Sequence, residues 1–290
     1  MIQNLIYFFT EFSAAWLVFL FILGLLVGSF LNVVIYRLPV MMQREWRSDC
    51  LEFLEQPADS VTPEPFNLNR PRSRCGHCGH QITALENIPV LSFLLLRGKC
   101  SSCKTSLSIQ YPLVEIFTGF ISLIIGWYFG VSIEAIAGLI FSWSLIALSG
   151  IDIGHKLLPD SITLPLMWLG ILLALFNVYI DLSTSVIGAM AGYLSLWSVY
   201  IVFKLVTGNE GMGHGDFKLL AALGAWVGWK LLFVIILTSS AVGAAFGLTM
   251  ILLKRNQRGT QIPFGPYLAA AGWLCFLWGY PILAFYQSML

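Results

Sequence analysis

Charged residues are scarce in this sequence. Only 11% of its 290 residues are Asp, Glu, Lys or Arg, whereas 58% are hydrophobic, and the mean hydropathy is +0.81. Soluble domains carry about 25% charged residues, so this composition excludes a soluble globular protein. The net charge of +1 also provides no overall field that would attract nucleic acid, and we expect no nucleic-acid partner.

Several common catalytic motifs are also missing. The sequence has no Gly-x-Ser-x-Gly nucleophile elbow and no His-Glu-x-x-His zinc motif. It has no Gly-x-Gly-x-x-Gly turn after a strand, which argues against a dinucleotide-binding fold or a soluble methyltransferase fold of that type. Any chemistry must therefore come from other side chains.

Long uncharged runs occupy most of the chain, and a helix needs about 20 apolar residues to cross a bilayer. The first run has no Lys or Arg before it and no small-residue cleavage site after it, so we expect it to remain as an anchor. The run 219–229 is short, but Phe217 and a snorkelling Lys218 would lengthen it. The pattern predicts an all-α polytopic membrane protein with about eight transmembrane helices, at 12–36, 116–133, 135–151, 161–180, 182–203, 219–229, 231–253 and 259–290.

The positive charges predict the orientation of these helices. If residue 1 is outside and all eight runs cross, fifteen of the sixteen Lys and Arg residues are cytoplasmic and only Lys230 is outside. A re-entrant 219–229 would instead move Lys254, Arg255 and Arg258 to the outer face. We therefore predict a multi-pass protein with its polar insertion in the cytoplasm.

That polar insertion suggests three domains. We predict a first transmembrane helix at 1–37, a cytoplasmic metal-binding domain at 38–110 and a seven-helix membrane domain at 111–290. The stretch from about 39 to 69 has little apolar periodicity, so we expect loops and short helices there. No internal repeat of fixed period is evident.

Four of the six cysteines lie in the insertion as two Cys-x-x-Cys pairs, Cys75/Cys78 and Cys100/Cys103. In a reducing cytoplasm such pairs are typical of a structural zinc site with four thiolates and no open position. Such a site would stabilise a domain too small to have much of a core. The alternatives are a redox pair, four unrelated thiols, or a site in which His77 or His80 replaces a sulfur.

Two carboxylates stand out because the predicted topology puts both at cytoplasmic helix ends. Asp152 follows the run 135–151, and Asp216 follows the glycine-rich turn 211–215. Intramembrane or boundary carboxylates are functional candidates, although a helix cap would also explain Asp216. Asp160 is expected to be an N-cap, and Asp181 an outer-loop charge.

If Asp152 and Asp216 meet, they could share a proton. One carboxylate would then act as a base on water while the other, protonated, polarises a carbonyl. This is aspartic peptidase chemistry, and the titration would belong to the pair.

The motifs resemble those of the type IV prepilin peptidases, a family of bifunctional leader peptidases and N-methyltransferases. The likeness covers almost the whole chain and is carried by the two cysteine pairs together with 28–39, 111–115, 151–160, 211–218 and 263–266.

The resemblance implies several functional assignments. Asp152 and Asp216 would be the catalytic aspartates, the second within a Gly-x-Gly-Asp signature, and the four cysteines would hold zinc. The enzyme would sit in the bacterial inner membrane with its active site facing the cytoplasm. It would cleave after a glycine in type IV prepilins and type II secretion pseudopilins, and then methylate the new N-terminus with S-adenosylmethionine. Gly98 is a suggested methyl-donor contact, against the simpler interpretation of a turn in the zinc loop.

A prepilin suits an enzyme embedded in membrane lipid, because its basic leader stays in the cytoplasm while its apolar helix lies in the bilayer. Glu45, Asp49, Glu52 and Glu55 could bind that leader or be a solvated face, and Glu115 could pair with a basic loop residue or touch substrate. The alternative functions are an ion- or proton-coupled carrier using Asp152, Asp216 and Lys218 with a regulatory zinc loop, and a membrane scaffold for pilus assembly.

Overall fold

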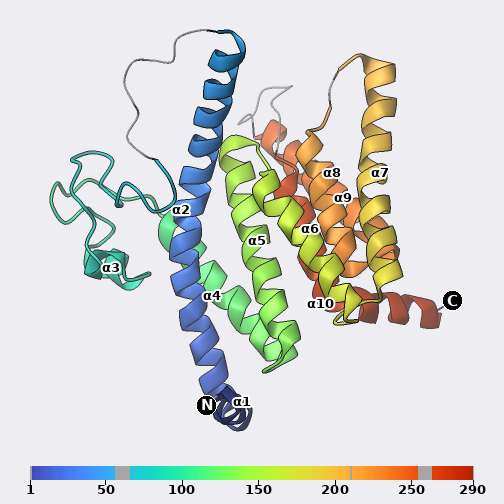
Figure 1. Cartoon of the computed structure of the whole chain (residues 1–290), viewed down its shortest axis with the longest axis horizontal. Helices are drawn as coiled ribbons and strands as arrows, with labels where there is room; N and C mark the ends of the chain where they lie inside the picture. Colours follow the sequence, from blue (N-terminus) through green and yellow to red (C-terminus); the bar gives the residue numbers. More distant parts are fainter. Residues whose placement is uncertain (1, 56–65, 210, 254–262, 290) are drawn as a thin grey trace. The chain divides into compact units, whose positions relative to one another are not determined.

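The computed structural model describes residues 2–55, 66–209, 211–253 and 263–289, and the regular structure among them is helical. Two isolated β-bridges accompany the helices. The predicted all-α class is confirmed. In chain order the helices are α1 (Ile2–Glu11), α2 (Ser13–Phe53), the 3-10 turn η1 (Leu85–Asn87), α3 (Leu91–Leu95), α4 (Gln110–Phe129), α5 (Ile133–His155), α6 (Asp160–Leu175), α7 (Leu182–Thr207), α8 (His214–Val227), η2 (Trp229–Leu231), α9 (Leu232–Leu252) and α10 (Gly265–Met289) (Figure 1).

Each of the eight predicted membrane segments corresponds to a helix, namely α2 or one of α4 to α10. Six of these are long and apolar enough to cross a membrane. The exceptions are α6 with 16 residues and α8 with 14. At a rise of 1.5 Å per residue they span roughly 24 and 21 Å, less than the roughly 30 Å of hydrocarbon. The basic residues Lys254, Arg255 and Arg258 lie outside the described residues.

The chain divides into two compact units, residues 1–139 and 140–290. The first unit contains α1 to α4, with the cysteine-rich loop (residues 66–109) between α2 and α4, and the first turns of α5; the second contains most of α5 and α6 to α10. The boundaries predicted at 37 and 110 are not tested by this division and stay predictions.

In the first unit α2 packs closely against α4. Gly24 and Gly28 form a Gly-x-x-x-Gly step on α2, which lets two helix backbones approach. A methyl group added at Gly24 would lie 2.8 Å from the Cα atom of Gly119, and one added at Gly28 would lie 2.7 Å from the Cα atom of Glu115. The small residues therefore let the first half of α4 pack directly against α2.

The expectation of loops after residue 39 is wrong for the first part of that stretch. Helix α2 continues through Pro39 to Phe53, and residues 43–50 are exposed. Extending an existing helix avoids the cost of nucleating a new one, so residues with good helix propensity continue it even without an apolar face.

In the second unit α8 is the central helix. It is buried from Asp216 to its end apart from the partly exposed Lys218. Gly188 on α7 and Gly224 on α8 touch backbone to backbone, and Trp226 donates a 2.8 Å hydrogen bond to the carbonyl of Leu166 on α6. A helix that is apolar on all sides must be buried on all sides, so α8 is enclosed by protein despite its short length.

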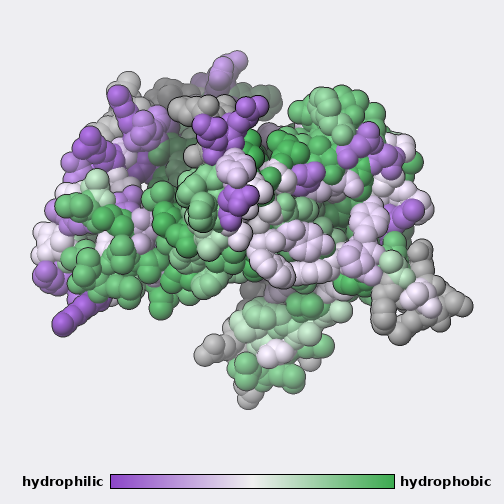
Figure 2. Space-filling view, turned by 90° about the horizontal axis from the view of Figure 1, so that it is seen from below, coloured by the Kyte–Doolittle hydropathy of each residue, from purple (hydrophilic) through white to green (hydrophobic). Residues whose placement is uncertain are grey.

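The outer surface of the helices carries many large hydrophobic side chains. Examples are Phe30 at 52% exposed, Trp127 at 70% and Phe233 at 72%. Hydrophobic residues occupy much of the face shown in Figure 2. Such a surface requires lipid as its surroundings, and the protein is a multi-pass membrane protein.

Candidate active site and metal-binding cluster

Asp152 lies in the last turn of α5 and is 5% exposed. Its Oδ2 atom accepts a 2.9 Å hydrogen bond from the backbone N–H of Gly265, the first residue of α10. Unpaired N–H groups at a helix start carry a partial positive charge. The start of α10 therefore helps to offset the cost of burying this carboxylate.

Asp216 lies in the first turn of α8 and is 8% exposed. Its backbone N–H binds the carbonyl of Gly213 at 3.2 Å, so the glycine-rich turn leads directly into the helix. The partial positive charge at the start of α8 favours a carboxylate at this place.

The structure brings the two predicted carboxylates together. The negative charge of Asp152 acts on the Asp216 carboxyl group. Leu158, in the link after α5, touches positions next to both: added methyl groups at Gly215 and Gly265 would lie 2.8 and 3.1 Å from its side chain. Within this unit the end of α5 and the starts of α8 and α10 lie at the same end of the helices (Figure 1). The catalytic role of the pair stays a prediction.

Asp160 does not cap α6 as expected. Pro159 occupies the cap position without a side-chain bond, and Asp160 is the first helical residue. Both Asp160 oxygens accept hydrogen bonds from the Lys218 ammonium group, at 2.8 and 2.7 Å. This ion pair joins the start of α6 to α8 two residues after Asp216. Its only sequence signal was the presence of opposite charges in two helix starts.

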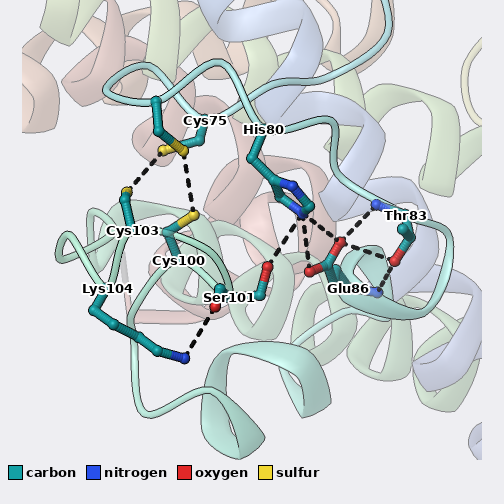
Figure 3. Close-up of polar contacts among 9 residues, drawn as sticks. Cys75, His80, Thr83, Glu86, Cys100, Ser101, Cys103 and Lys104 are labelled. Atoms are coloured by element: carbon teal, nitrogen blue, oxygen red, sulfur yellow. Dashed lines mark hydrogen bonds and ion pairs between the residues drawn. The ribbon is translucent and has the colours of Figure 1, made fainter.

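The cysteine-rich loop contains a cluster that can hold a metal ion. The Sγ atoms of Cys75, Cys78, Cys100 and Cys103 all lie within 4.8 Å of one another, with Cys75–Cys103 at 3.8 Å and Cys78–Cys100 at 4.0 Å (Figure 3). Zinc–sulfur bonds of about 2.3 Å in a tetrahedron separate the sulfurs by about 3.8 Å. The four sulfur atoms are therefore spaced to coordinate one metal ion tetrahedrally, with no coordination position left open.

The thiols also have the electrostatics of a cation site. Hydrogen bonding by Thr105, through side chain and backbone, lowers the pKa of Cys103 to about 5. A backbone hydrogen bond at His80 favours ionised Cys78, but burial and the three other thiols outweigh it and raise the pKa of Cys78 to about 11. Thiolates this close repel one another, and a bound cation would remove that repulsion.

The two halves of the cysteine-rich loop, which follow Cys75 and Cys100, have the same backbone conformation. Cys75 N–H binds the carbonyl of His80 five residues later, and Cys100 N–H binds that of Thr105. Gly79 and Lys104, each four residues after the first cysteine of its half, have φ values of 71° and 59°. The loop therefore contains a structural repeat with an offset of 25 residues, and the expectation of no internal repeat is wrong here. The two halves share little sequence beyond the cysteines, so the repeat is not evident from the residues alone.

The histidines near the cysteines have other surroundings. His80 Nε2 lies 3.2 Å from the Ser101 hydroxyl and 3.4 Å from Glu86, which links the two halves of the loop to η1 (Figure 3). Hydrogen bonds from Ser101 and Thr83 lower the pKa of Glu86 to about 2. Glu86 therefore stays ionised near neutral pH, and His80 is its partner in this structure.

Gly98 has a conformational reason to be glycine. Its φ of 67° favours glycine, and an added methyl group would lie 2.9 Å from the Phe93 ring. Its carbonyl also accepts the 2.8 Å bond from Leu107 N–H that closes the second half of the loop. These contacts agree with a turn, and the suggested methyl-donor contact at Gly98 stays a prediction.

Glu115 holds the loop to the first unit's helices. It is 8% exposed on α4 and accepts a 2.8 Å hydrogen bond from Val90 N–H. Val90 has a φ of 60°, an unfavourable value for a β-branched residue. Of the two roles considered for Glu115, this contact is neither, since its partner is loop backbone.

Comparisons with known proteins cover most of the chain. Residues 22–129 match the bacterial peptidase A24 N-terminal domain, and residues 139–248 match the type IV leader peptidase family. Proteins named prepilin leader peptidase/N-methyltransferase are similar over most of both chains. The identity is 58% for that of Stutzerimonas stutzeri, covering 91% of each chain, and 52% for that of Pseudomonas putida, covering 93% of each. It is 51% for that of Aeromonas hydrophila, covering 94% of this chain and 95% of the relative. No solved structure matches the chain.

Proposed function

The chain belongs to the type IV leader peptidase family, and it is a bifunctional leader peptidase and N-methyltransferase of prepilins; from this premise we propose that Asp152 and Asp216 are its catalytic dyad. The observation that supports the dyad is two buried carboxylates from different helices within electrostatic reach of each other. The comparisons favour this activity over the carrier and scaffold alternatives.

The dyad would activate water between its two carboxyl groups. One carboxylate takes a proton from the water as its oxygen attacks the scissile carbonyl carbon. The protonated partner donates a proton to the carbonyl oxygen. When the tetrahedral intermediate collapses, the carbon–nitrogen bond breaks and the leaving amine receives a proton from the pair. The helix starts at Gly265 and Asp216 would steady the negative charge through this cycle.

The substrate is proposed to be a prepilin that lies partly in the membrane, with type II secretion pseudopilins as further substrates. Its basic leader would remain in the cytoplasm, its apolar helix would lie in the bilayer, and cleavage would follow a glycine between them. This geometry calls for carboxylates at helix ends, as Asp152 and Asp216 are. We place the enzyme in the bacterial inner membrane, with the dyad and cysteine loop on the cytoplasmic side, in agreement with the distribution of basic residues.

The other cofactors are proposed from the same premise. Cys75, Cys78, Cys100 and Cys103 would hold a structural zinc ion, with no open position for catalysis. S-adenosylmethionine would supply the methyl group to the new N-terminal amine once the leader has left. Glu45, Asp49 and Glu52 follow one another at helical spacing on the exposed end of α2, which supports a contact with the basic leader.

Isosteric removal of each carboxylate tests the dyad. We expect Asp152→Asn and Asp216→Asn each to reduce cleavage of a purified prepilin by at least about 1,000-fold, since an amide cannot act as the base. Asp181→Asn is the matched control, because Asp181 caps α7 away from the dyad and asparagine caps equally well. Methylation of an already cleaved pilin checks that the variants are folded. Normal cleavage by either dyad variant would remove that residue from the catalytic pair.

A further inference from the structure

A cavity of about 610 Å³ lies in the first unit, between α2 and the cysteine-rich loop. Phe30, Val33 and Arg37 line it from α2, and Arg72, Thr83 and Asn87 are among the loop residues that line it. The volume is within the usual range of ligand sites, about 300–1,000 Å³. None of these residues has a part in the proposed peptidase chemistry.

Two arginines, Arg37 and Arg72, are among the described residues that line the cavity. Arg37 is only 8% exposed, and one of its terminal nitrogens donates a 2.9 Å hydrogen bond to the carbonyl of Asn67. No Asp or Glu is among the described residues that line the cavity. Neither Arg37 nor Arg72 is in an ion pair with another described residue. Arg37 also contacts the carbonyl of Leu68 and lies over the Phe66 ring, but neither contact neutralises its charge, and Arg72 is exposed. The two guanidinium groups therefore make this wall of the cavity basic, which suits a negatively charged ligand.

The depth of the cavity in the membrane narrows the choice of ligand. Arg37 is the first charged residue after the apolar run 12–36, which at 1.5 Å per residue is roughly 37 Å long and sufficient to cross the hydrocarbon. Arg37 therefore lies at the level of the lipid headgroups. Phe30, seven residues earlier, lies roughly 10 Å deeper along the helix and is 52% exposed. The site is basic at its polar end and apolar at its membrane end.

We propose that this cavity binds the headgroup of an anionic phospholipid. Its phosphate would lie between Arg37 and Arg72, and its acyl chains would follow α2 past Val33 and Phe30. Thr83 and Asn87 would supply hydrogen bonds to the headgroup oxygens. The lipid would thereby tie the cysteine-rich loop to the first membrane helix.

The charge of the cavity favours an anionic lipid over the two other proposed ligands of the enzyme, the prepilin leader and S-adenosylmethionine. A basic prepilin leader is repelled by two arginines. S-adenosylmethionine carries a sulfonium and an ammonium group against one carboxylate, so its net charge is positive as well. An anionic headgroup complements both guanidinium groups at once.

Lipid binding to the full-length protein tests the proposal. In neutral detergent, the fluorescence anisotropy of labelled phosphatidylglycerol is compared with that of labelled phosphatidylcholine with the same acyl chains. We expect phosphatidylglycerol to bind at least about tenfold more tightly. Arg72→Gln should weaken its binding about fivefold, because each basic residue at an anionic lipid surface contributes about 1 kcal/mol, and Arg72→Lys should retain most of the affinity.

Arg97→Gln is the matched control, since Arg97 is exposed in the same unit but does not line the cavity; its affinity should stay within about twofold of the unmodified protein. Arg72 carries the test because Arg37 also binds the loop backbone, and melting temperatures confirm that each variant is folded. Four results would each overturn the proposal: equal binding of the two lipids, an equal loss in Arg97→Gln, displacement of the lipid by soluble glycerol phosphate at similar concentration, or its competitive displacement by S-adenosylmethionine.

Discussion

At the scale of single residues, the backbone of Gly265 lies very close to the Asp152 carboxylate. Gly265 presents its N–H to Asp152 at 2.9 Å, and an added methyl group there would lie 2.7 Å from the same carboxylate oxygen. A side chain at position 265 would push the carboxylate away from its hydrogen bond. In the proposed dyad Gly265 would be a positioning residue, and the short distance to Asp152 leaves no room for a side chain there.

We predict that Gly265→Ala lowers kcat for prepilin cleavage by about 100-fold, because a displacement on the order of 1 Å can have that effect on a reacting group. KM should change much less. The matched control is Gly154→Ala on α5, two residues from Asp152, where an added methyl group meets nothing within 4 Å. Equal losses in the two variants would show that the approach of Gly265 has no special role.

The two halves of the cysteine loop provide a second comparison of single residues. Gly79 has a φ of 71°, whereas Gly76 does not have a positive φ, and neither glycine has a neighbour within 4 Å of an added methyl group. We predict that Gly79→Ala destabilises the loop by about 1–2 kcal/mol, the usual penalty for a left-handed L-residue. Gly76→Ala should cost less than about 0.5 kcal/mol. Chemical denaturation in the presence of zinc measures the difference, and equal effects would contradict a conformational cause.

At the scale of elements, the short helix α8 carries Asp216 into the middle of the second unit. Its side chains are buried by α6, α7 and α10, and close glycine contacts with α7 fix its position along the bundle. The pair Asp160–Lys218 adds a polar contact at the start of the same helix. Helix packing thus determines where the Asp216 carboxylate lies.

A charge exchange tests the Asp160–Lys218 contact. We predict that Asp160→Lys and Lys218→Asp each lower kcat and change KM much less. Each substitution places two like charges together at the start of the helix that carries Asp216. The double variant should recover most of the lost activity by restoring an ion pair with the opposite sense. Because both groups are partly exposed, the stability change of a neutral variant such as Asp160→Asn should stay below about 1 kcal/mol. A double variant no better than the worse single one would show that the pair does not position α8.

At the scale of the whole molecule, each unit contains one group of chemically important side chains. The four cysteines are in the first unit and the two carboxylates are in the second. Within residues 66–109 of the cysteine-rich loop, the buried residues are Cys75, Pro89 and Cys100. Because so small a core contributes little stability, we expect the proposed metal ion to supply much of the stability of this loop.

We predict about one zinc ion per purified chain, because four thiolates make one closed site. Cys75→Ser should lower the zinc content and the melting temperature. His80→Ala should leave the zinc content unchanged, since His80 contacts Glu86 and Ser101 instead. The metal should be lost as the pH falls, because protons compete for the thiolates. Full zinc content in Cys75→Ser together with its loss in His80→Ala would identify His80 as the ligand.

Several features could be predicted because they depend on local composition and spacing. Each of the eight uncharged runs corresponds to a helix, six of them long and apolar enough to cross a membrane, and the two Cys-x-x-Cys pairs located the thiol cluster. The helical continuation of α2 to Phe53 was missed because no apolar periodicity marks it. The pairing of Asp160 with Lys218 was missed because the two residues are 58 positions apart and Asp160 has the sequence context of a cap.

The amino-acid sequence by itself determined that this chain is a membrane protein, that its loop carries two pairs of closely spaced cysteines, and that Asp152 and Asp216 are the candidate catalytic carboxylates. These conclusions need only the hydrophobicity of neighbouring residues and the reach of a short turn. The tertiary structure alone decided that Gly265 touches Asp152, that Leu158 lies close to both Gly215 and Gly265, and that two arginines line a cavity with no acid among its described lining residues. Such contacts join residues that are distant in the chain, and only the packing of helices brings them within a few ångströms.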